Sequence, residues 1–284
     1  MRPIAVFVTF FALALPAAAE TVRLGDRYYD IELPANPRGA PLILALHGGG
    51  GDPAQFAAAS GLARAATRAG FAVAFPAGTG RWGDRLLTWN GGYCCGHAAR
   101  TGVDDLGFLS QVIRDAADRF GVDGSGVYLT GMSNGAILSE TFAARNPGLV
   151  RAVAGVSGTM DTSRTRVKGQ VPALIIHGTA DTMVPFAGGQ GDTSLTRTDF
   201  ASVASVVTAF LAPWGSVTET GRKIDRRDDG TSVIVTDHAK GAKVVLRLIK
   251  VEGGAHHWPG GRKARLTAGK TQEIDANTEI LRFF

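Results

Sequence analysis

Residues 127–135 read VYLTGMSNG, in which the apolar run Val127–Thr130 leads into the pentapeptide Gly131-Met132-Ser133-Asn134-Gly135. The next residues, 136–145, predict a helix, so the pentapeptide is expected to form a turn between a strand and that helix. Such a turn is so sharp that small residues must flank the serine. It lifts the hydroxyl to the edge of the sheet, and Ser133 is therefore predicted to be a nucleophile rather than part of a plain glycine turn.

Buried strands alternate with helices along most of the chain. Apolar runs indicate strands at 41–46, 71–75, 127–130, 150–156 and 173–176, and helices are predicted at 53–69, 104–119, 136–145, 200–211 and 274–284. Two short strands are expected within 21–33, and the alternation over 217–251 indicates final strands or an edge meander. Strands that are apolar on both faces are typical of a mostly parallel sheet with helices on both faces. We therefore expect a single α/β domain.

The first 19 residues have the pattern of an export signal. Arg2 precedes an apolar run at 4–15, and Ala17-Ala18-Ala19 precedes Glu20. This run is too short to span a bilayer, so we expect residues 20–284 to be a soluble catalytic domain, periplasmic or extracellular, with no membrane partner. Hydrophobic residues make up 45% and charged residues 19%, which excludes intrinsic disorder. The net charge of +5 is spread along the chain and does not indicate a nucleic-acid partner.

A serine hydroxyl is a weak nucleophile near neutral pH, so it needs a histidine base and an acid that orients this base. Where the serine stands on a strand-to-helix turn, the acid and the base follow it in the order Asp, His. Asp181 follows the apolar run at 173–176, whereas Asp192 lies well past the end of this strand. The base is expected to be His256 rather than His257, because the glycines that precede His256 leave it freer to enter the site.

Two backbone amides are expected to stabilise the oxyanion of the reaction. One is the amide of Asn134, directly after the nucleophile, and the other comes from the glycine run at 48–51, at Gly49. A phosphate-binding loop is the other interpretation of this glycine run, but the Gly-Lys-Ser/Thr sequence that such a loop requires does not follow it. The arrangement requires no metal and no organic cofactor.

Several short segments, spread over nearly all of residues 20–284, form a combination far more specific than any single motif. They are His47-Gly-Gly-Gly, Trp89-Asn90, Cys94-Cys95-Gly96, Val103-Asp104-Asp105-x-Gly-Phe108, Gly131-Met-Ser-Asn-Gly135, His177-Gly-Thr-x-Asp181, Gly253-x-x-His256-x-Trp258-Pro259 and Arg282-Phe-Phe. This combination resembles the secreted esterase family of polyhydroxybutyrate (PHB) depolymerases and feruloyl or acetylxylan esterases. The resemblance implies an α/β-hydrolase fold without a separate lid domain, and the triad Ser133, Asp181 and His256. One departure is Ala255, where family members often have glycine.

The loop at 76–103 is long for a compact domain, which is typical of a functional loop. It contains Trp89, which together with Trp258 is a candidate wall of the substrate pocket, because such a pocket needs flat apolar surface. Core packing is the alternative role for both indoles. Asp105 either braces this loop or caps the helix that follows it.

Cys94 and Cys95 are the only cysteines, and they are adjacent in the chain. Export to an oxidising compartment allows them to pair with each other. Neighbouring Cα atoms lie about 3.8 Å apart across a trans peptide, below the usual disulfide range, so this bond requires a distorted peptide. A vicinal disulfide and two free thiols both remain open.

The expected reaction is ester hydrolysis through an acyl-enzyme. The expected substrates are soluble hydroxybutyrate oligomers, since the sequence shows neither a flexible linker nor a separate module for binding a polymer. Feruloyl or acetyl esters of plant cell-wall fragments are the alternative. A serine peptidase of the same fold and a non-catalytic binding protein are two further interpretations.

Overall fold

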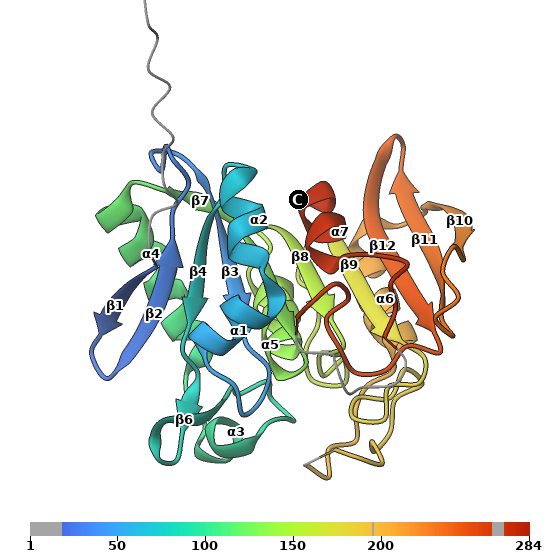
Figure 1. The fold of residues 1–284 in the computed structure, drawn as a ribbon, viewed down its shortest axis with the longest axis horizontal. Coiled ribbons are helices and arrows are strands. Elements are labelled where there is room, and N and C mark those ends of the chain that lie inside the picture. The colour runs from blue at the N-terminus through green and yellow to red at the C-terminus, as the bar shows by residue number, and fades with distance from the viewer. Residues whose placement is uncertain (1–18, 195, 263–269) are drawn as a thin grey trace, which may run out of the picture.

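A single sheet forms the centre of the molecule in the computed structural model, which describes residues 19–194, 196–262 and 270–284 (Figure 1). The predicted export signal lies, up to residue 18, outside the described residues. The strands of the sheet are β1 (Glu20–Leu24), β2 (Arg27–Glu32), β3 (Pro41–Leu46), β4 (Ala72–Pro76), β7 (Asp123–Met132), β8 (Val150–Val156), β9 (Ala173–Gly178), β10 (Thr218–Ile224), β11 (Ser232–Lys240) and β12 (Lys243–Glu252).

The ten strands lie in the order β1-β2-β4-β3-β7-β8-β9-β12-β11-β10. The six central strands, from β4 to β12, pair in parallel with their neighbours. The outer strands at both edges pair antiparallel. The predicted mostly parallel sheet is therefore confirmed, and the predicted meander at 217–251 forms one of its edges.

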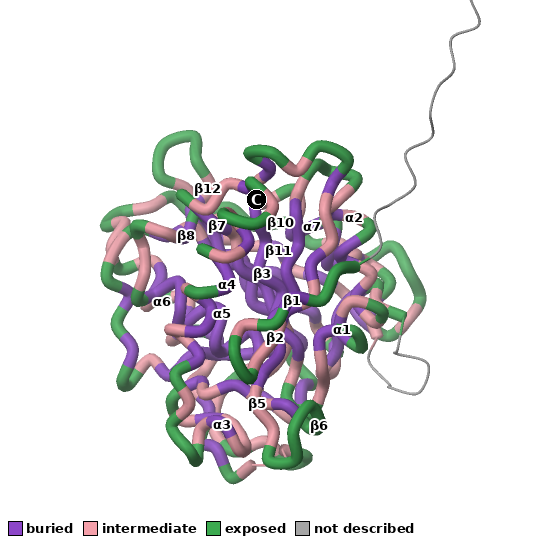
Figure 2. The backbone as a smooth tube through the Cα atoms, turned by 90° about the vertical axis from the view of Figure 1, so that its left-hand side faces the viewer, coloured by how far each residue is buried: buried purple, intermediate pink, exposed green. Residues whose placement is uncertain are grey.

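Helices cover both faces of this sheet. The helices α1 (Pro53–Ser60), α2 (Leu62–Arg68) and α7 (Ala276–Phe283) lie on one face, and α4 (Asp105–Phe120), α5 (Asn134–Arg145) and α6 (Val203–Leu211) lie on the other (Figure 1). Alternate residues of β3 show why both faces need a cover: Leu44 packs into one hydrophobic cluster and Ile43 into the other. The strands are accordingly buried at the centre of the molecule (Figure 2).

One predicted helix is interrupted in the structure. The pattern at 53–69 predicts a single helix, but Gly61 has a φ of 66° and separates α1 from α2. A left-handed residue cannot continue a right-handed helix, and glycine adopts this conformation without a steric penalty. The Asp52 side chain caps α1, because it accepts a hydrogen bond of 2.8 Å from the Gln55 amide.

The loop at 76–103 contains short regular elements that its composition did not predict. They are the hairpin of β5 (Thr79–Gly80) and β6 (Gly83–Thr88) and the helix α3 (Gly96–Thr101). Asp105 braces this loop, because its carboxylate accepts a hydrogen bond of 2.7 Å from the Asn90 amide and lies 2.8 Å from the Arg27 guanidinium. The adjacent Asp104 is the residue that caps α4.

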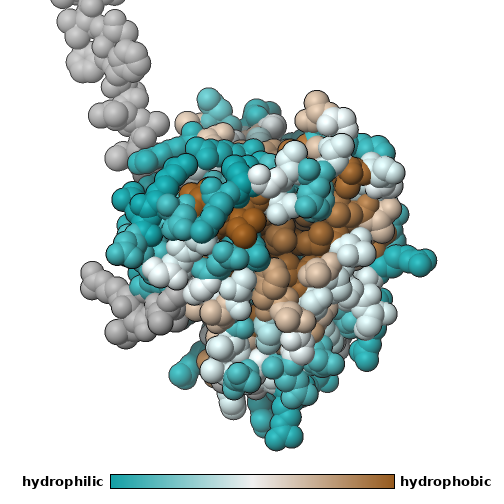
Figure 3. Space-filling model, turned by 90° about the vertical axis from the view of Figure 1, so that its right-hand side faces the viewer, coloured by the Kyte–Doolittle hydropathy of each residue, from teal (hydrophilic) through white to brown (hydrophobic). Residues whose placement is uncertain are grey.

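Apolar side chains reach the surface in two regions. Trp82 and Leu86 of the β5–β6 hairpin are 64% and 59% exposed. The side of the molecule that carries β10 to β12 also shows an apolar area surrounded by polar residues (Figure 3). Within the described ranges, no helix combines the length and the apolar character that crossing a membrane requires.

Candidate active site

Ser133 occupies the predicted turn between β7 and α5, with φ 57° and ψ −123°. A non-glycine residue with positive φ is strained, and such strain is held in place by its surroundings. A Cβ atom at Gly135 would collide with the carbonyl oxygens of Leu46 and His47, and one at Gly131 would collide with the backbone of Gly135. Close packing of β3, β7 and α5 therefore imposes small residues on both sides of the serine, as predicted.

Asp181 and His256 are hydrogen-bonded to each other. His256 Nδ1 lies 2.8 Å from Asp181 Oδ2, and Asp181 Oδ1 accepts hydrogen bonds of 2.9 Å from the amides of Met183 and Val184. Because a carboxylate only accepts hydrogen bonds, Nδ1 carries a proton, and in the neutral ring Nε2 is the nitrogen that can accept one. This is the state that a general base needs.

The Asp181 carboxylate is buried, with its side chain fully shielded from solvent. Burial acts to raise its pKa, but hydrogen bonds from His177 and His256 outweigh burial and hold the pKa well below the usual range. His177 Nε2 lies 3.4 Å from Asp181 Oδ2 and 2.8 Å from the Val184 carbonyl oxygen. His177 therefore packs against the loop that carries Asp181.

His257 forms hydrogen bonds with the backbone and none with Asp181. Its Nδ1 lies 3.0 Å from the Ala255 carbonyl oxygen, and its Nε2 accepts a hydrogen bond of 3.3 Å from the Thr271 amide. Both ring nitrogens are thus occupied by the backbone, and burial lowers the pKa of His257. Of the two neighbouring histidines, the structure pairs His256 with the carboxylate.

Backbone contacts connect the serine turn to the histidine loop. The Ser133 amide donates a hydrogen bond of 2.8 Å to the Val156 carbonyl oxygen. Ser157 follows Val156 in the chain, and its hydroxyl donates a hydrogen bond of 3.4 Å to the His257 carbonyl oxygen. Among the described residues, the Ser133 hydroxyl itself makes no hydrogen bond, either to His256 or to another group. Ser133 thus carries a free hydroxyl at the carboxyl end of the parallel strands, where the Asp181–His256 pair also follows β9 and β12.

Gly49 and Asn134 lie against each other beside Ser133. A Cβ atom built on Gly49 would stand 3.6 Å from Asn134 Cβ, and one built on Gly48 would stand 3.6 Å from Ser133 Cβ. Neither the Gly49 amide nor the Asn134 amide donates a hydrogen bond to another described residue. Both amides are available to an oxyanion.

Trp89 is buried in the core and connects the turn at Ser133 with the glycine run at 48–51. Its backbone forms two hydrogen bonds with the Asn134 side chain, of 2.7 and 3.0 Å, and its indole Nε1 donates to the His47 carbonyl oxygen at 2.9 Å. His47 in turn accepts a hydrogen bond of 3.0 Å from the Gly78 amide, which requires a neutral ring; burial lowers the pKa of His47 to about 4. Trp89 thus supports the site from behind.

A cavity of about 360 Å³ opens next to Ser133. Its lining consists of Gly49, Gly50, Arg81, Trp82, Leu86, Thr88, Cys95, Gly96, His97, Arg100, Ser133, Asn134, Ile137, Met183, Val184, Ser194, Thr196 and Phe200. Trp89 and Trp258, which the sequence suggested as pocket walls, are not part of this lining. Trp258 is 5% exposed, packs against Phe56 and donates a hydrogen bond of 3.1 Å to Asn277. Both indoles have the alternative role, packing in the core.

Several lining residues come from the loop at 76–103. Sequence reasoning missed Arg81, Trp82, His97 and Arg100 as lining residues. The available signal was the position of all four in a long loop that was itself expected to be functional. Their individual roles were hidden because the hairpin and α3, which aim them at the cavity, are too short to show a pattern.

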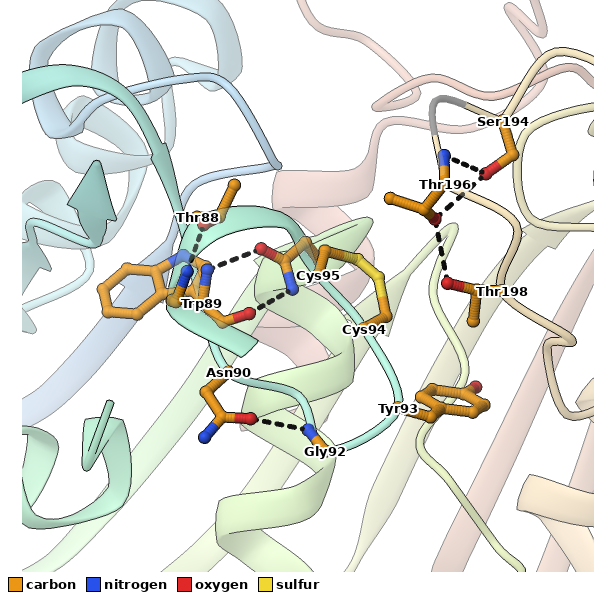
Figure 4. Close-up of a disulfide and its surroundings, with 12 residues drawn as sticks. Thr88, Trp89, Asn90, Gly92, Tyr93, Cys94, Cys95, Ser194, Thr196 and Thr198 are labelled. Atoms are coloured by element: carbon orange, nitrogen blue, oxygen red, sulfur yellow. Dashed lines mark hydrogen bonds between the residues drawn. A yellow bond between two sulfur atoms is a disulfide. The ribbon is translucent and has the colours of Figure 1, made fainter. Parts of the chain in front are cut away.

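A disulfide joins Cys94 and Cys95 in this same loop, across a cis peptide bond (Figure 4). Of the two alternatives that the sequence left open, the structure has the bonded one. Cys94 is buried against Ile137 of α5, and Cys95 lines the cavity. The disulfide thus stands between the core and the cavity wall.

Several known esterases are similar to this chain in sequence. The family model described as "Esterase PHB depolymerase" matches residues 29–164. The protein named "Putative esterase NocK", from Nocardia uniformis subsp. tsuyamanensis, is 31% identical over 267 residues, covering 87% of this chain and 75% of the relative. "Feruloyl esterase B" of Piromyces equi is 28% identical over 157 residues, covering 54% of this chain and 28% of the relative.

Solved structures share the fold at low sequence identity. The acetyl xylan esterase from Aspergillus awamori has a TM-score of 0.62 and 17% identity, covering 94% of this chain and 100% of its own. The esterase PE8 has a TM-score of 0.55 and 16% identity, covering 89% of this chain and 95% of its own. These likenesses confirm the α/β-hydrolase fold. The chain belongs to the PHB depolymerase family of esterases and is a carboxylic ester hydrolase.

Proposed function

We propose that this chain is an exported serine esterase that hydrolyses short hydroxybutyrate oligomers. The observation that carries the proposal is the Asp181–His256 hydrogen bond, which leaves His256 Nε2 free to act as a base for the strained Ser133 turn. Ser133, Asp181 and His256 are the catalytic residues of this proposal.

The reaction begins when His256 Nε2 takes the proton of the Ser133 hydroxyl and the serine oxygen attacks the ester carbonyl carbon. The amides of Asn134 and Gly49 donate hydrogen bonds to the oxyanion that forms. His256 then gives the proton to the leaving alcohol, so that an acyl-enzyme remains on Ser133. Water, activated by the same histidine, attacks this acyl group and releases the acid. Asp181 stays ionised throughout and holds His256 in the required tautomer.

Hydroxybutyrate oligomers suit the lining of the cavity. Ile137, Val184 and Phe200 offer apolar contacts for the methyl groups of such a chain, while Ser194 and Thr196 offer hydroxyls for its ester oxygens. The cavity volume of about 360 Å³ lies within the range of small-molecule sites. Feruloyl or acetyl esters of cell-wall fragments are the second candidate, favoured by the names of the feruloyl and acetylxylan esterase relatives.

The catalytic assignment is tested with Ser133→Ala, because this change removes the nucleophile and leaves its surroundings in place. Hydrolysis of p-nitrophenyl butyrate is expected to fall by about 10³-fold or more. Retention of most of the activity would refute the assignment.

Wild-type protein is also expected to hydrolyse esters much faster than matched amides, which separates an esterase from a peptidase.

The substrate is tested by comparing kcat/KM for hydroxybutyrate trimer with the values for methyl ferulate and acetylated xylo-oligosaccharides. The proposal expects the trimer to be the best of the three. A clear preference for ferulate or acetylxylan would replace the proposed substrate and leave the proposed catalytic residues unchanged.

Export is tested by fractionating cells that produce the chain with and without residues 1–19. Only the chain that starts with residues 1–19 is expected outside the cytoplasm.

A further inference from the structure

We propose that the cavity binds the free carboxylate of its substrate through a basic rim formed by Arg81, His97 and Arg100. This inference rests on the proposed function and narrows it: the preferred substrates are esters that carry a negative charge, and uncharged esters of the same size are disfavoured.

The basic rim comes from two elements that lie side by side. Arg81 stands in the turn between β5 and β6, and His97 and Arg100 belong to α3. The two elements contact each other, and both lie at the carboxyl end of the parallel strands, where Ser133 also stands (Figure 1). All three rim residues and Ser133 line one and the same cavity. A ligand can therefore touch the rim and the nucleophile together.

The charged side chains that line this cavity in the described part of the chain all carry the same sign of charge, which is positive. No aspartate or glutamate is among its described lining residues, so Arg81 and Arg100 face it without an acidic neighbour there. Neither arginine forms an ion pair with a described acidic residue, in contrast to Arg27, which is 2.8 Å from the buried Asp105. A guanidinium group binds a carboxylate through two parallel hydrogen bonds.

The lining residues that come from the segment 183–200 are uncharged. Met183, Val184 and Phe200 supply apolar surface, and Ser194 and Thr196 supply hydroxyls. Figure 4 shows these two hydroxyl side chains, which are linked by a hydrogen bond of 3.4 Å. A ligand that fits both the basic rim and these uncharged residues is apolar along its body and anionic at one end.

The apolar side chains next to the basic rim match such a ligand. Trp82 and Leu86 are exposed on the same hairpin as Arg81, and the Arg81 guanidinium lies 5.6 Å from the centre of the Trp82 ring. This distance is within the range of a cation–π contact, which orients the guanidinium without neutralising its charge. An exposed apolar pair beside a cation suits a short hydroxyalkanoate chain whose last unit carries a free carboxylate.

The chemistry of a hydroxybutyrate oligomer provides this carboxylate. When Ser133 attacks the ester bond nearest the acid end, the leaving alcohol is hydroxybutyrate, which carries the carboxylate. The basic rim holds this leaving group while its alkoxide oxygen receives the proton from His256. A neutral acetylated sugar has no group that uses the rim.

The test compares the free acid of the hydroxybutyrate dimer with its methyl ester, in which a neutral ester group replaces the carboxylate, and follows cleavage of the bond between the two hydroxybutyrate units in both. Wild-type protein is expected to have a kcat/KM about tenfold higher for the free acid at low ionic strength, mainly through a lower KM. This ratio is expected to fall towards one in the double variant Arg81→Gln/Arg100→Gln, and also in wild type at high salt. Arg114→Gln, which removes an exposed arginine on α4, is the matched control and is expected to keep the ratio.

A second measurement separates this inference from the proposed function. The free-acid dimer is tested as a competitive inhibitor of p-nitrophenyl butyrate hydrolysis, with its methyl ester as the comparison. If the dimer inhibits through the two arginines but is not hydrolysed, the basic rim stands and the proposed substrate falls. If the dimer is hydrolysed but the acid and the methyl ester behave alike, the rim falls and the proposed function stands. Thermal unfolding of each variant identifies a change that only disturbs the fold.

Discussion

The Asp181 carboxylate accepts hydrogen bonds from two backbone amides and from His256, and it lies close to His177. These contacts hold its pKa below the value in the unfolded chain, which is about 3.9. A carboxylate with a depressed pKa stabilises the fold at pH values above its unfolded pKa, and this contribution is lost as the pH falls through the folded pKa. Asp181 is therefore ionised over the whole range in which an esterase works.

Replacing this charge while keeping the side-chain shape is expected to remove the base. In Asp181→Asn, the amide group can leave His256 in the wrong tautomer, as in other Ser-His-Asp sites. We expect kcat for p-nitrophenyl butyrate to fall by about 10³ to 10⁴-fold with little change in KM. Asp192→Asn, at an exposed position past the same strand, is the matched control and is expected to keep normal activity. Equal activity of the two variants would contradict the assignment.

At the scale of helices and strands, patterns predicted most elements but not their interruptions. The apolar run at 150–156 predicts β8 with the bounds that the structure shows, because both faces of a central parallel strand are buried. The break at Gly61, where φ is 66°, was not predictable from periodicity, since the residues on both sides continue a helical pattern. The β5–β6 hairpin and α3 were missed because these elements are too short to show a periodic pattern of apolar residues.

The break between α1 and α2 gives a prediction at this scale. Gly61→Ala forces a residue with a Cβ into a left-handed conformation, so we expect the free energy of unfolding to fall by about 1 kcal/mol. Denaturant unfolding measures this change. Gly148→Ala is the matched control: a Cβ there meets nothing within 4 Å, and the residue has no left-handed φ, so we expect no loss. A loss of equal size in both variants would contradict the role given to Gly61.

On the scale of the whole molecule, one buried acid links pH to stability. Glu140 of α5 is 1% exposed, and its Oε2 accepts a hydrogen bond of 2.8 Å from the Met160 amide. Its other oxygen, Oε1, has no hydrogen-bond partner among the described residues. Burial raises the pKa of Glu140 to about 8. The folded protein therefore keeps this side chain protonated at pH values where the unfolded chain ionises it.

The sign of the effect follows from this difference. A group with a raised pKa gives its full stability below its unfolded pKa, about 4.3, and this stability is lost as the pH rises towards about 8. Glu140→Gln keeps the shape and does not titrate. We expect its melting temperature, relative to wild type, to increase steadily from pH 5 to pH 8. Asp118→Asn, at an exposed position of α4 that forms no ion pair with another described residue, is the control and is expected to follow wild type. Parallel curves for Glu140→Gln and wild type would contradict the raised pKa.

The candidate site was predictable where chemistry is tied to a sequence pattern. The turn at Ser133 and the order of Asp181 and His256 could be recognised because the fold fixes them along the chain. The cavity wall could not be predicted, because it is assembled from the four segments 49–50, 81–100, 133–137 and 183–200, whose contacts are not encoded in any local period. For the same reason, Trp89 was a candidate for the wall, and only its bonds to Asn134 and His47 place it behind the site.

The central claim is that Ser133 is activated by His256 and not by its neighbour His257. The most direct measurement is the rate at which a fluorophosphonate labels the protein, with the modified residue located by mass spectrometry. We expect labelling at Ser133 in wild type, a rate close to that of wild type in His257→Ala, and a rate lower by about 10³-fold in His256→Ala. Labelling at another residue, or a larger loss in His257→Ala than in His256→Ala, would contradict the account.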